Sequence, residues 1–313
     1  RSVVMEYIAI PKLNKKVSRL IMGSASLSPD NADAMIAVLD EFVRLGGTTF
    51  DTAENYGPSE TILGKWMKER GNRDDLVILT KGAHPYGRNR VTPDDITTDL
   101  LGSLERLQVD YVDLYVLHRD DPAVPVGPII DVLNEHIRAG RIKRIGASNW
   151  TWRRIKEAND YAARNGLQGF ALSSTNFSLA RPLEPMWPGT VFADEETIRW
   201  HEDNQFPLFA WAAQAGGFFT GAFSPDNRSN PDMVRVYYSE DNWERYRRAE
   251  RMAERKGVTA PQIVLAYVLA QNFPICGVVG SLSVQELRAN CEAVRLKLTR
   301  EEVEWLDLRR ESL

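Results

Sequence analysis

The sequence has only two cysteines, Cys276 and Cys291, among 313 residues. Two thiols are too few for a disulfide framework, and no signal sequence is recognisable, so we expect reduced thiols in a cytoplasmic protein. The chain begins with Arg1 instead of methionine, which leaves a trimmed start and a lost leader open.

The sequence also has no apolar run of membrane-spanning length and no excess of basic residues. Its 39 Lys and Arg against 43 Asp and Glu give a net charge of -4, which disfavours a broad basic face for nucleic acid. It has no GxGxxG or P-loop motif, and its four histidines have no partners at metal-ligand spacing. We therefore expect a soluble protein that binds no membrane, nucleic acid or metal.

What the sequence does have is an alternation of apolar strand-like runs and helical patterns along its whole length. Eight runs predict strands, at residues 19–23, 48–51, 76–80, 113–117, 144–147, 169–173, 207–211 and 275–279. Apolar residues at three- and four-residue spacing predict helices at 31–45, 60–70, 92–107, 128–139, 151–165, 194–204 and 261–270. Near-continuous apolar strands alternating with helices indicate a parallel sheet, and eight repeats predict a closed (β/α)8 TIM barrel.

Three other segments complete the predicted architecture. Residues 7–17, with Pro11 between two short apolar pieces, predict an N-terminal β-hairpin that caps the barrel floor. Residues 180–192 and 222–239 exceed ordinary loop length and are rich in Pro, Gly, Asn and Arg, which is typical of functional loops. We place these loops on the C-terminal face. No change of composition marks a linker, so residues 1–313 are expected to form one domain.

Titratable side chains fall at the ends of three consecutive predicted strands. Asp51 closes the second strand, Lys81 follows the third and His118 follows the fourth. Taken singly, each has an ordinary explanation as a turn cap, a solvated cation or a rim histidine. In a parallel barrel, however, the C-terminal ends of the strands surround one mouth, where active sites form. We therefore expect the three side chains to converge there.

A phenol, Tyr56, lies five residues after Asp51. A phenol of pKa ~10 is a poor proton donor at neutral pH. A close ammonium, here Lys81, stabilises the phenolate and lowers that pKa, while Asp51 keeps the ammonium charged. We hypothesise that Tyr56 thereby becomes a general acid and base and that neutral His118 bonds the oxygen on which charge develops. Such a group suits a carbonyl that accepts hydride from another molecule.

These residues belong to stretches that resemble the aldo-keto reductase superfamily. The stretches follow the family order from "VSRLIMGSA" through "FDTAENYG", "TKG", "YVDLYVLH", "RIKRIGASN" and "GGFFTG" to "VVGSLSVQELRANCEA". The resemblance implies a (β/α)8 barrel that binds a nicotinamide cofactor at its C-terminal mouth and reduces aldehydes or ketones. It also implies a catalytic tetrad of Asp51, Tyr56, Lys81 and His118, with Tyr56 as the proton donor.

The resemblance further implies a cofactor site. Ser148 and Asn149 match the pair that binds the nicotinamide carboxamide, although a Ser-Asn helix cap is an alternative. Ser174 stands where the family usually has glutamine, and Trp211 stands where a tyrosine usually stacks on the nicotinamide ring. The other expected cofactor contacts are Ala212, Gln214, Gly216 and Gly217 at the pyrophosphate and Gly280, Ser281, Glu286 and Asn290 towards the adenosine end.

NADP(H) is the expected cofactor, with NAD(H) as an alternative. Relatives that prefer NADPH place a cation beside the 2′-phosphate at the positions of Gly280 and Glu286, and neither residue is basic here. Glu286 has a second interpretation, because the stretch "SVQE" has the pattern of a capping box. The remaining candidates for a phosphate contact are Arg228, Arg235 and Arg288.

The expected partner is a small carbonyl substrate, and the oligomeric state stays open. We expect the pocket to comprise residues 25–28, 84–86 and 119–121, the loop around Trp187, and Phe218. The polar stretches "HPYGRNR" and "HRDD" favour hydroxylated substrates such as sugars. Three alternatives remain: a sugar or alcohol dehydrogenase that uses the same residues in reverse, an isomerase or lyase that forms a Schiff base on the lysine of the tetrad, and a non-catalytic cofactor-sensing subunit.

Overall fold

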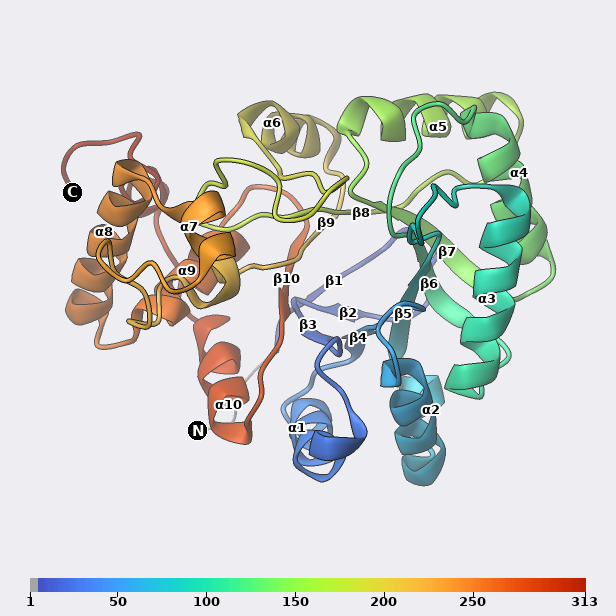
Figure 1. The fold of residues 1–313 in the computed structure, drawn as a ribbon, viewed down its shortest axis with the longest axis horizontal. Coiled ribbons are helices and arrows are strands. Elements are labelled where there is room, and N and C mark those ends of the chain that lie inside the picture. Colours follow the sequence, from blue (N-terminus) through green and yellow to red (C-terminus); the bar gives the residue numbers. More distant parts are fainter. Residues whose placement is uncertain (1–4) are drawn as a thin grey trace.

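The eight predicted strands form a closed parallel barrel in the computed structural model, which describes residues 5–313. Arg1 therefore lies outside the described residues. Around the barrel the order is β10, β3, β4, β5, β6, β7, β8 and β9, and Figure 1 shows the helices arranged around these strands. The (β/α)8 prediction is confirmed. The strands are β3 (Leu20–Gly23), β4 (Thr49–Asp51), β5 (Val77–Gly82), β6 (Val112–Leu117), β7 (Ile142–Ser148), β8 (Ser173–Ser174), β9 (Leu208–Ala210) and β10 (Ile275–Val279).

The seven predicted helices are present with ends shifted by two residues or fewer. They are α1 (Ala32–Arg44), α2 (Ser59–Arg70), α3 (Pro93–Leu107), α4 (Val126–Arg138), α5 (Trp152–Arg164), α6 (Glu195–Asn204) and α9 (Ala260–Leu269). Local capping explains several starts: the Thr92 hydroxyl, for example, accepts a hydrogen bond from Asp95 N ahead of α3, with Pro93 in the first turn.

Further helices lie in the C-terminal half, namely α7 (Pro231–Tyr237), α8 (Glu240–Lys256), α10 (Val284–Ala293) and α11 (Arg300–Leu306). The prediction of an irregular loop over residues 222–239 is therefore wrong for α7. The Asn230 side chain caps this helix by accepting from Met233 N, and Pro231 occupies its first turn. In Figure 1, α7, α8 and α9, drawn in orange, lie together on one side of the barrel, and α3, α4 and α5 lie on the other.

The sixth strand is shorter and later than predicted, at Ser173–Ser174 instead of residues 169–173. Its expected first half is held by a side chain from α5. Asn159 accepts a hydrogen bond from Phe170 N at 2.7 Å and donates one to Phe170 O at 3.0 Å. This amide satisfies the backbone of Phe170, and hydrogen bonds to β7 begin with Ala171 N, which donates to Ile145 O at 2.8 Å.

The N-terminal hairpin is present and closes the barrel floor. β1 (Tyr7–Ile8) pairs antiparallel with β2 (Val17–Ser18). Beside it, Ile10 and Val17 join the cluster of apolar side chains that fills the barrel interior. The floor is thus sealed by burial of apolar surface, and the opposite end, where the strands terminate, remains for a site.

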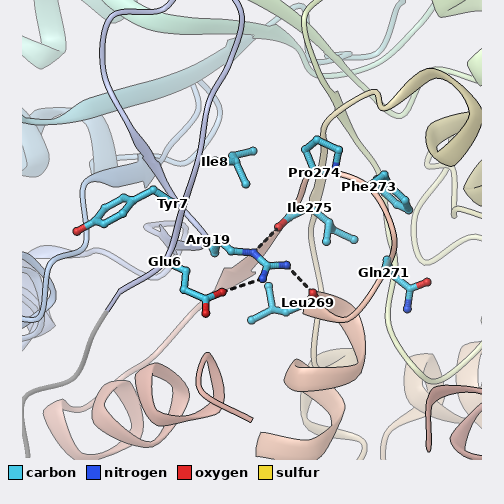
Figure 2. Close-up of a pocket in the computed structure, with 9 residues that line it drawn as sticks. All are labelled: Glu6, Tyr7, Ile8, Arg19, Leu269, Gln271, Phe273, Pro274 and Ile275. Atoms are coloured by element: carbon cyan, nitrogen blue, oxygen red, sulfur yellow. Dashed lines mark hydrogen bonds and ion pairs between the residues drawn. The ribbon is translucent and has the colours of Figure 1, made fainter. Parts of the chain in front are cut away.

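A hollow of about 520 Å³ lies on the outside of this floor (Figure 2). Arg19 projects into it and donates hydrogen bonds to Glu6 Oε2 at 3.0 Å, Ile275 O at 3.4 Å and Leu269 O at 2.5 Å. Its charge is therefore satisfied within the protein. Because the hollow lies at the end of the barrel opposite the tetrad, we place the functional site at the mouth instead.

Candidate active site

Lys81 lies at the centre of the mouth and contacts two of the other expected catalytic residues. Its Nζ atom donates to Asp51 Oδ1 at 2.5 Å, to Thr52 O at 3.1 Å and to Tyr56 Oη at 3.3 Å. Asp51 ends β4 opposite Leu79 of β5, and Lys81 lies further along β5, so both side chains reach the same end of the barrel. Both side chains are almost fully buried. The ammonium therefore joins the carboxylate to the phenol.

Tyr56 is held in a turn between β4 and α2. Its N–H donates to Ala53 O, and its carbonyl accepts from Ser59 N, each at 3.1 Å. The Ser59 hydroxyl is 2.7 Å from Ser24 Oγ at the end of β3. Gly57 follows with φ +55°, a conformation that L side chains rarely adopt. The turn is thus tied to the barrel on both sides of the phenol.

The pKa directions in this group differ in part from the prediction. Burial tends to lower the pKa of Lys81, but Asp51 and Tyr56 outweigh it and raise that pKa, so the amine stays charged. For Tyr56, burial is the largest influence and raises the pKa of the hydroxyl, and the opposing effect of Lys81 does not cancel it. The prediction of a net lowered pKa for Tyr56 is therefore wrong. The phenol is protonated at neutral pH.

His118 follows β6 and faces the same phenol. Its ring centroid is 5.8 Å from that of Tyr56 with the planes at 79°. Burial, followed by the charge of Lys81, lowers the pKa of His118 well below its ordinary value, so the ring is neutral at neutral pH. Among the described residues, its buried Nδ1 atom has no hydrogen-bond partner. A neutral imidazole can hydrogen-bond a substrate oxygen on which negative charge develops, and the protonated phenol beside it can then donate a proton to that oxygen.

Three of the expected cofactor residues lie together beside the tetrad. Ser148 pairs with Ser174 across β7 and β8, and Trp211 N donates to Thr175 O at 3.2 Å. The Ser174 hydroxyl, the Thr175 hydroxyl and Trp211 Nε1 are buried without a partner among residues 5–313. Buried polar groups are normally hydrogen-bonded, so unpaired groups on these neighbouring segments fit a ligand with polar atoms, such as an amide. Thr175 was not predicted, although the polar run "SSTN" after a strand is a signal for it.

Asn149 has a structural role that the sequence did not predict. The residue has φ +59°, and its Nδ2 atom donates to His118 O at 3.2 Å. Its Oδ1 atom accepts from Val191 N at 3.1 Å. The amide thus joins the end of β6 to the long loop after β8, and a carboxamide contact from Asn149 stays a prediction.

The expected pyrophosphate segment has an unusual backbone. Ala212, Ala215, Gly216 and Gly217 all have positive φ, at +48°, +53°, +60° and +87°. Alanine rarely adopts this conformation, and such strain is found mainly at functional sites. Backbone turns of this kind also form concavities in which N–H groups bind anions. The segment therefore fits a phosphate-bearing ligand.

The residues expected at the adenosine end form a hydrogen-bonded chain. Gln214 Nε2 donates to Asn290 Oδ1, and Asn290 Nδ2 donates to Ser281 Oγ, each at 2.9 Å. Gly280 is exposed, and a Cβ there would meet no atom of residues 5–313 within 4 Å. Glu286 behaves differently: its carboxylate accepts from Leu282 N at 2.9 Å, so it caps the start of α10, one residue earlier than the box predicts.

The mouth has aromatic side chains, and most of its charges are paired. Trp187, on the long loop after β8, stacks on Trp211 with centroids 5.6 Å apart, and His84 lies 5.5 Å from Tyr86. Phe218 is fully buried among other aromatic residues, so its prediction as a pocket residue is wrong. The charges that favoured sugars form internal pairs, namely Arg88 with Asp95 and Arg90 with Asp99, both at 2.7 Å, and Asp120 with Arg154 at 3.1 Å.

Comparison with known proteins decides the family. Residues 19–309 match the model of the Aldo/keto reductase family. The chain belongs to this family. The resemblance found in the sequence is confirmed, and this aldo-keto reductase is an NAD(P)H-dependent enzyme.

Three relatives illustrate the extent of the match. Aldo-keto reductase str7 of Strobilurus tenacellus is 30% identical over 90% of this chain and 84% of its own length. Aldo-keto reductase yakc [NADP(+)] of Schizosaccharomyces pombe is 31% identical over 88% of this chain and 82% of its own. The crystal structure of the thermostable aldo-keto reductase Tm1743 with the inhibitor epalrestat has a TM-score of 0.74 at 25% identity, over 97% of this chain and 99% of that one.

The three arginines considered for a cofactor phosphate have different partners in this aldo-keto reductase. Arg235 pairs with Glu184 at 2.7 Å and also bonds two carbonyl groups of the loop that carries Trp187, so it holds that loop. Arg228 lies over the ring of Tyr238. Arg288, on α10, pairs with Glu41 at 2.7 Å, and its side chain is 56% exposed.

Two negative findings concern residues 5–313 of the reductase. No cluster of three His, Cys, Asp or Glu side chains in this range is arranged to hold a metal ion. No helix in the same range is both long and apolar enough to span a membrane.

Both cysteines are buried, and burial raises the pKa of each thiol to about 12.

Proposed function

We propose that this enzyme reduces aryl aldehydes and ketones to alcohols, with hydride from NADPH and the proton from Tyr56. The observation that carries the proposal is the position of Lys81, whose Nζ atom contacts Asp51 Oδ1 at 2.5 Å and Tyr56 Oη at 3.3 Å. A charged amine between a carboxylate and a protonated phenol stabilises the phenolate that proton transfer leaves behind. A tyrosine that only packed in the core would not need a charged amine beside its hydroxyl.

The side chains of the mouth divide the work as follows. Tyr56 Oη donates its proton to the carbonyl oxygen, and Lys81 stabilises the resulting phenolate. Asp51 holds the ammonium charged and in place. Neutral His118 forms a hydrogen bond with the same oxygen and orients the carbonyl. Bound NADPH supplies the hydride for the carbonyl carbon.

The residues that hold the cofactor are proposed from the unpaired groups of Ser174 and Trp211, from the pairing of Ser148 with Ser174 and from the strained backbone after β9. Ser148 and Ser174 bond the carboxamide, and Trp211 packs on the nicotinamide ring. The strained segment from Ala212 to Gly217 binds the pyrophosphate. NADPH is supported by the printed name of the S. pombe relative, yakc [NADP(+)], and by Arg288, the exposed cation of α10.

Aryl substrates are supported by the side chains of the mouth and by two relatives. Trp187 and Tyr86 offer flat apolar faces, on which aromatic rings stack. Aryl-alcohol dehydrogenase GME11368 of Pestalotiopsis microspora and norsolorinic acid reductase stcV of Emericella nidulans are each 28% identical to this chain. The internal pairing of the acidic and basic side chains leaves few groups to bind sugar hydroxyls.

The name of the first of these relatives also favours a second candidate, the oxidation of aryl alcohols by the same residues. That direction needs the Tyr56 phenolate as a base. Because burial raises the pKa of Tyr56, the phenolate is scarce at neutral pH. At neutral pH the phenol is therefore in the form that donates the proton for reduction, and the rate of oxidation should rise in alkaline solution.

The test replaces Tyr56 by phenylalanine and follows the absorbance of NADPH with benzaldehyde as substrate. We expect kcat to fall by about 100-fold or more, with the Kd of NADPH changed by less than about threefold, since the ring is kept. Turnover that survives in Tyr56→Phe rejects the proton donor. Binding of NADPH without turnover in the unaltered enzyme favours the sensing subunit, and a borohydride-trapped adduct on Lys81 favours Schiff-base chemistry.

A further inference from the structure

Arg119 follows His118 directly at the end of β6 and lies in the mouth. Its backbone carbonyl accepts from Trp150 Nε1 at 3.0 Å, which fixes its main chain. Its guanidinium donates to His118 O at 2.9 Å and to Pro188 O at 3.4 Å. Neutral carbonyl groups of β6 and of the Trp187 loop thus hold the side chain, which is half-buried.

Arg119 differs from the other arginines of this region in its charge balance. Arg88, Arg90 and Arg154 each pair with an aspartate, whereas Arg119 forms no ion pair with an acidic side chain in residues 5–313. Burial lowers the pKa of Arg119, and among residues 5–313 the opposing influence comes from Tyr56 alone. A cation that loses water without gaining a counter-charge is unfavourable, and an anionic ligand would supply that charge.

The position of this cation relates it to the reacting group. Its charge acts to lower the pKa of Tyr56, His84 and His118, against the larger effect of burial at Tyr56, so it lies within electrostatic reach of all three. The carbonyl that binds it, Pro188 O, follows Trp187, which stacks on Trp211. A ligand group bound by Arg119 would therefore lie next to the loop that carries Trp187.

We infer that Arg119 binds an anionic oxygen group of the substrate, so that the preferred substrates are aromatic carbonyl compounds that also carry a carboxylate. The inference rests on the proposed function and adds the charge of the substrate to it. The guanidinium offers N–H groups in a planar fork, which matches a carboxylate. The cofactor phosphates do not compete for it, because their expected segment from Ala212 to Gly217 follows β9.

The test compares para-formylbenzoate with its uncharged methyl ester, which has the same ring and aldehyde. We expect the unaltered enzyme to have a kcat/KM at least about 10-fold higher for the carboxylate, as a charge-assisted hydrogen bond provides. Arg119→Gln should bring the ratio of the two kcat/KM values close to one, and Arg119→Lys should retain part of it. Arg300→Gln, at an exposed position on α11, is the matched control and should keep the full ratio.

The outcomes separate this inference from the proposed function. If the unaltered enzyme reduces neither aldehyde, the proposed function fails. If it reduces both and Arg119→Gln leaves their ratio unchanged, only the inference fails. An equal loss for both substrates in Arg119→Gln shows that Arg119 acts on Tyr56 or His118, and a weaker Kd for NADPH shows that it binds the cofactor. Either result also overturns the inference.

Discussion

Replacing Lys81 by methionine removes the ammonium between Asp51 and Tyr56 and keeps most of the side-chain volume. At the observed 3.3 Å between Nζ and Oη, an ammonium and a phenolate attract each other by about 5 kcal/mol at an effective dielectric constant of ~20. The Asp51 carboxylate opposes part of this, because it raises the pKa of Tyr56. We therefore expect kcat to fall by about 100-fold to 10,000-fold, the range typical of general acid catalysis.

The same substitution also affects stability, and this has to be separated from catalysis. Asp51 is 4% exposed, so without Lys81 its carboxylate is a buried charge with no cation beside it. Breaking a buried pair in this way costs about 3–5 kcal/mol. Adding Asp51→Asn to Lys81→Met removes the stranded charge, so the double variant should regain most of the free energy of unfolding and none of the activity.

The assay is single-turnover reduction of an aryl aldehyde with saturating NADPH at neutral pH, with urea unfolding of each variant in parallel. Single turnover reports the chemical step and excludes product release. If the folded double variant reduces the aldehyde within about tenfold of the unaltered enzyme, the reasoning about Lys81 and Tyr56 is refuted, because the expected loss is at least ~100-fold.

Three other predictions follow from the structure. Burial lowers the pKa of His201 to about 4, so the unfolded chain binds a proton there as pH falls below ~6.5 while the folded chain does not. The neutral His201 therefore contributes fully to the free energy of unfolding above that pH, and about 2 kcal/mol of this free energy is lost at pH 5. His201→Asn should reduce the pH dependence of urea unfolding by that amount, and an unchanged dependence contradicts the assignment. Trp211→Ala should weaken NADPH binding by about 10-fold and Trp211→Tyr should restore it, as measured by calorimetry; equal affinities exclude stacking. Arg288→Gln should weaken NADPH binding by about 10-fold relative to NADH, and an unchanged ratio of the two Kd values excludes a contact with the 2′-phosphate.

The convergence of Asp51, Lys81 and His118 could be predicted from the sequence for a simple reason. Each residue ends an apolar run, the runs alternate with helices, and parallel strands end at one face. The hairpin and the helix starts could also be predicted, because proline constrains its own backbone and threonine and serine side chains bond backbone groups a few residues away. Local patterns misled where a side chain of another element bonded the backbone, as at Phe170, whose N–H and carbonyl bond Asn159 of α5.

The details of the site depended on contacts between distant segments. The sequence suggested a lowered pKa for Tyr56, but the depth at which the turn is buried makes the net direction upward. The amide of Asn149 was expected to contact the cofactor, whereas in the structure it donates to His118 O and accepts from Val191 N. Phe218 turned inward with the aromatic core.

The sequence by itself determined the barrel and which residues stand at its mouth. Strands and helices bury apolar faces, so the spacing of apolar residues in the sequence reveals both the elements and their order. Only the tertiary structure decided which of those residues have partners. Ion pairs and burial depend on side chains far apart in the sequence, so nothing local distinguishes Arg119, which has no acidic partner in residues 5–313, from Arg154, which is paired with Asp120.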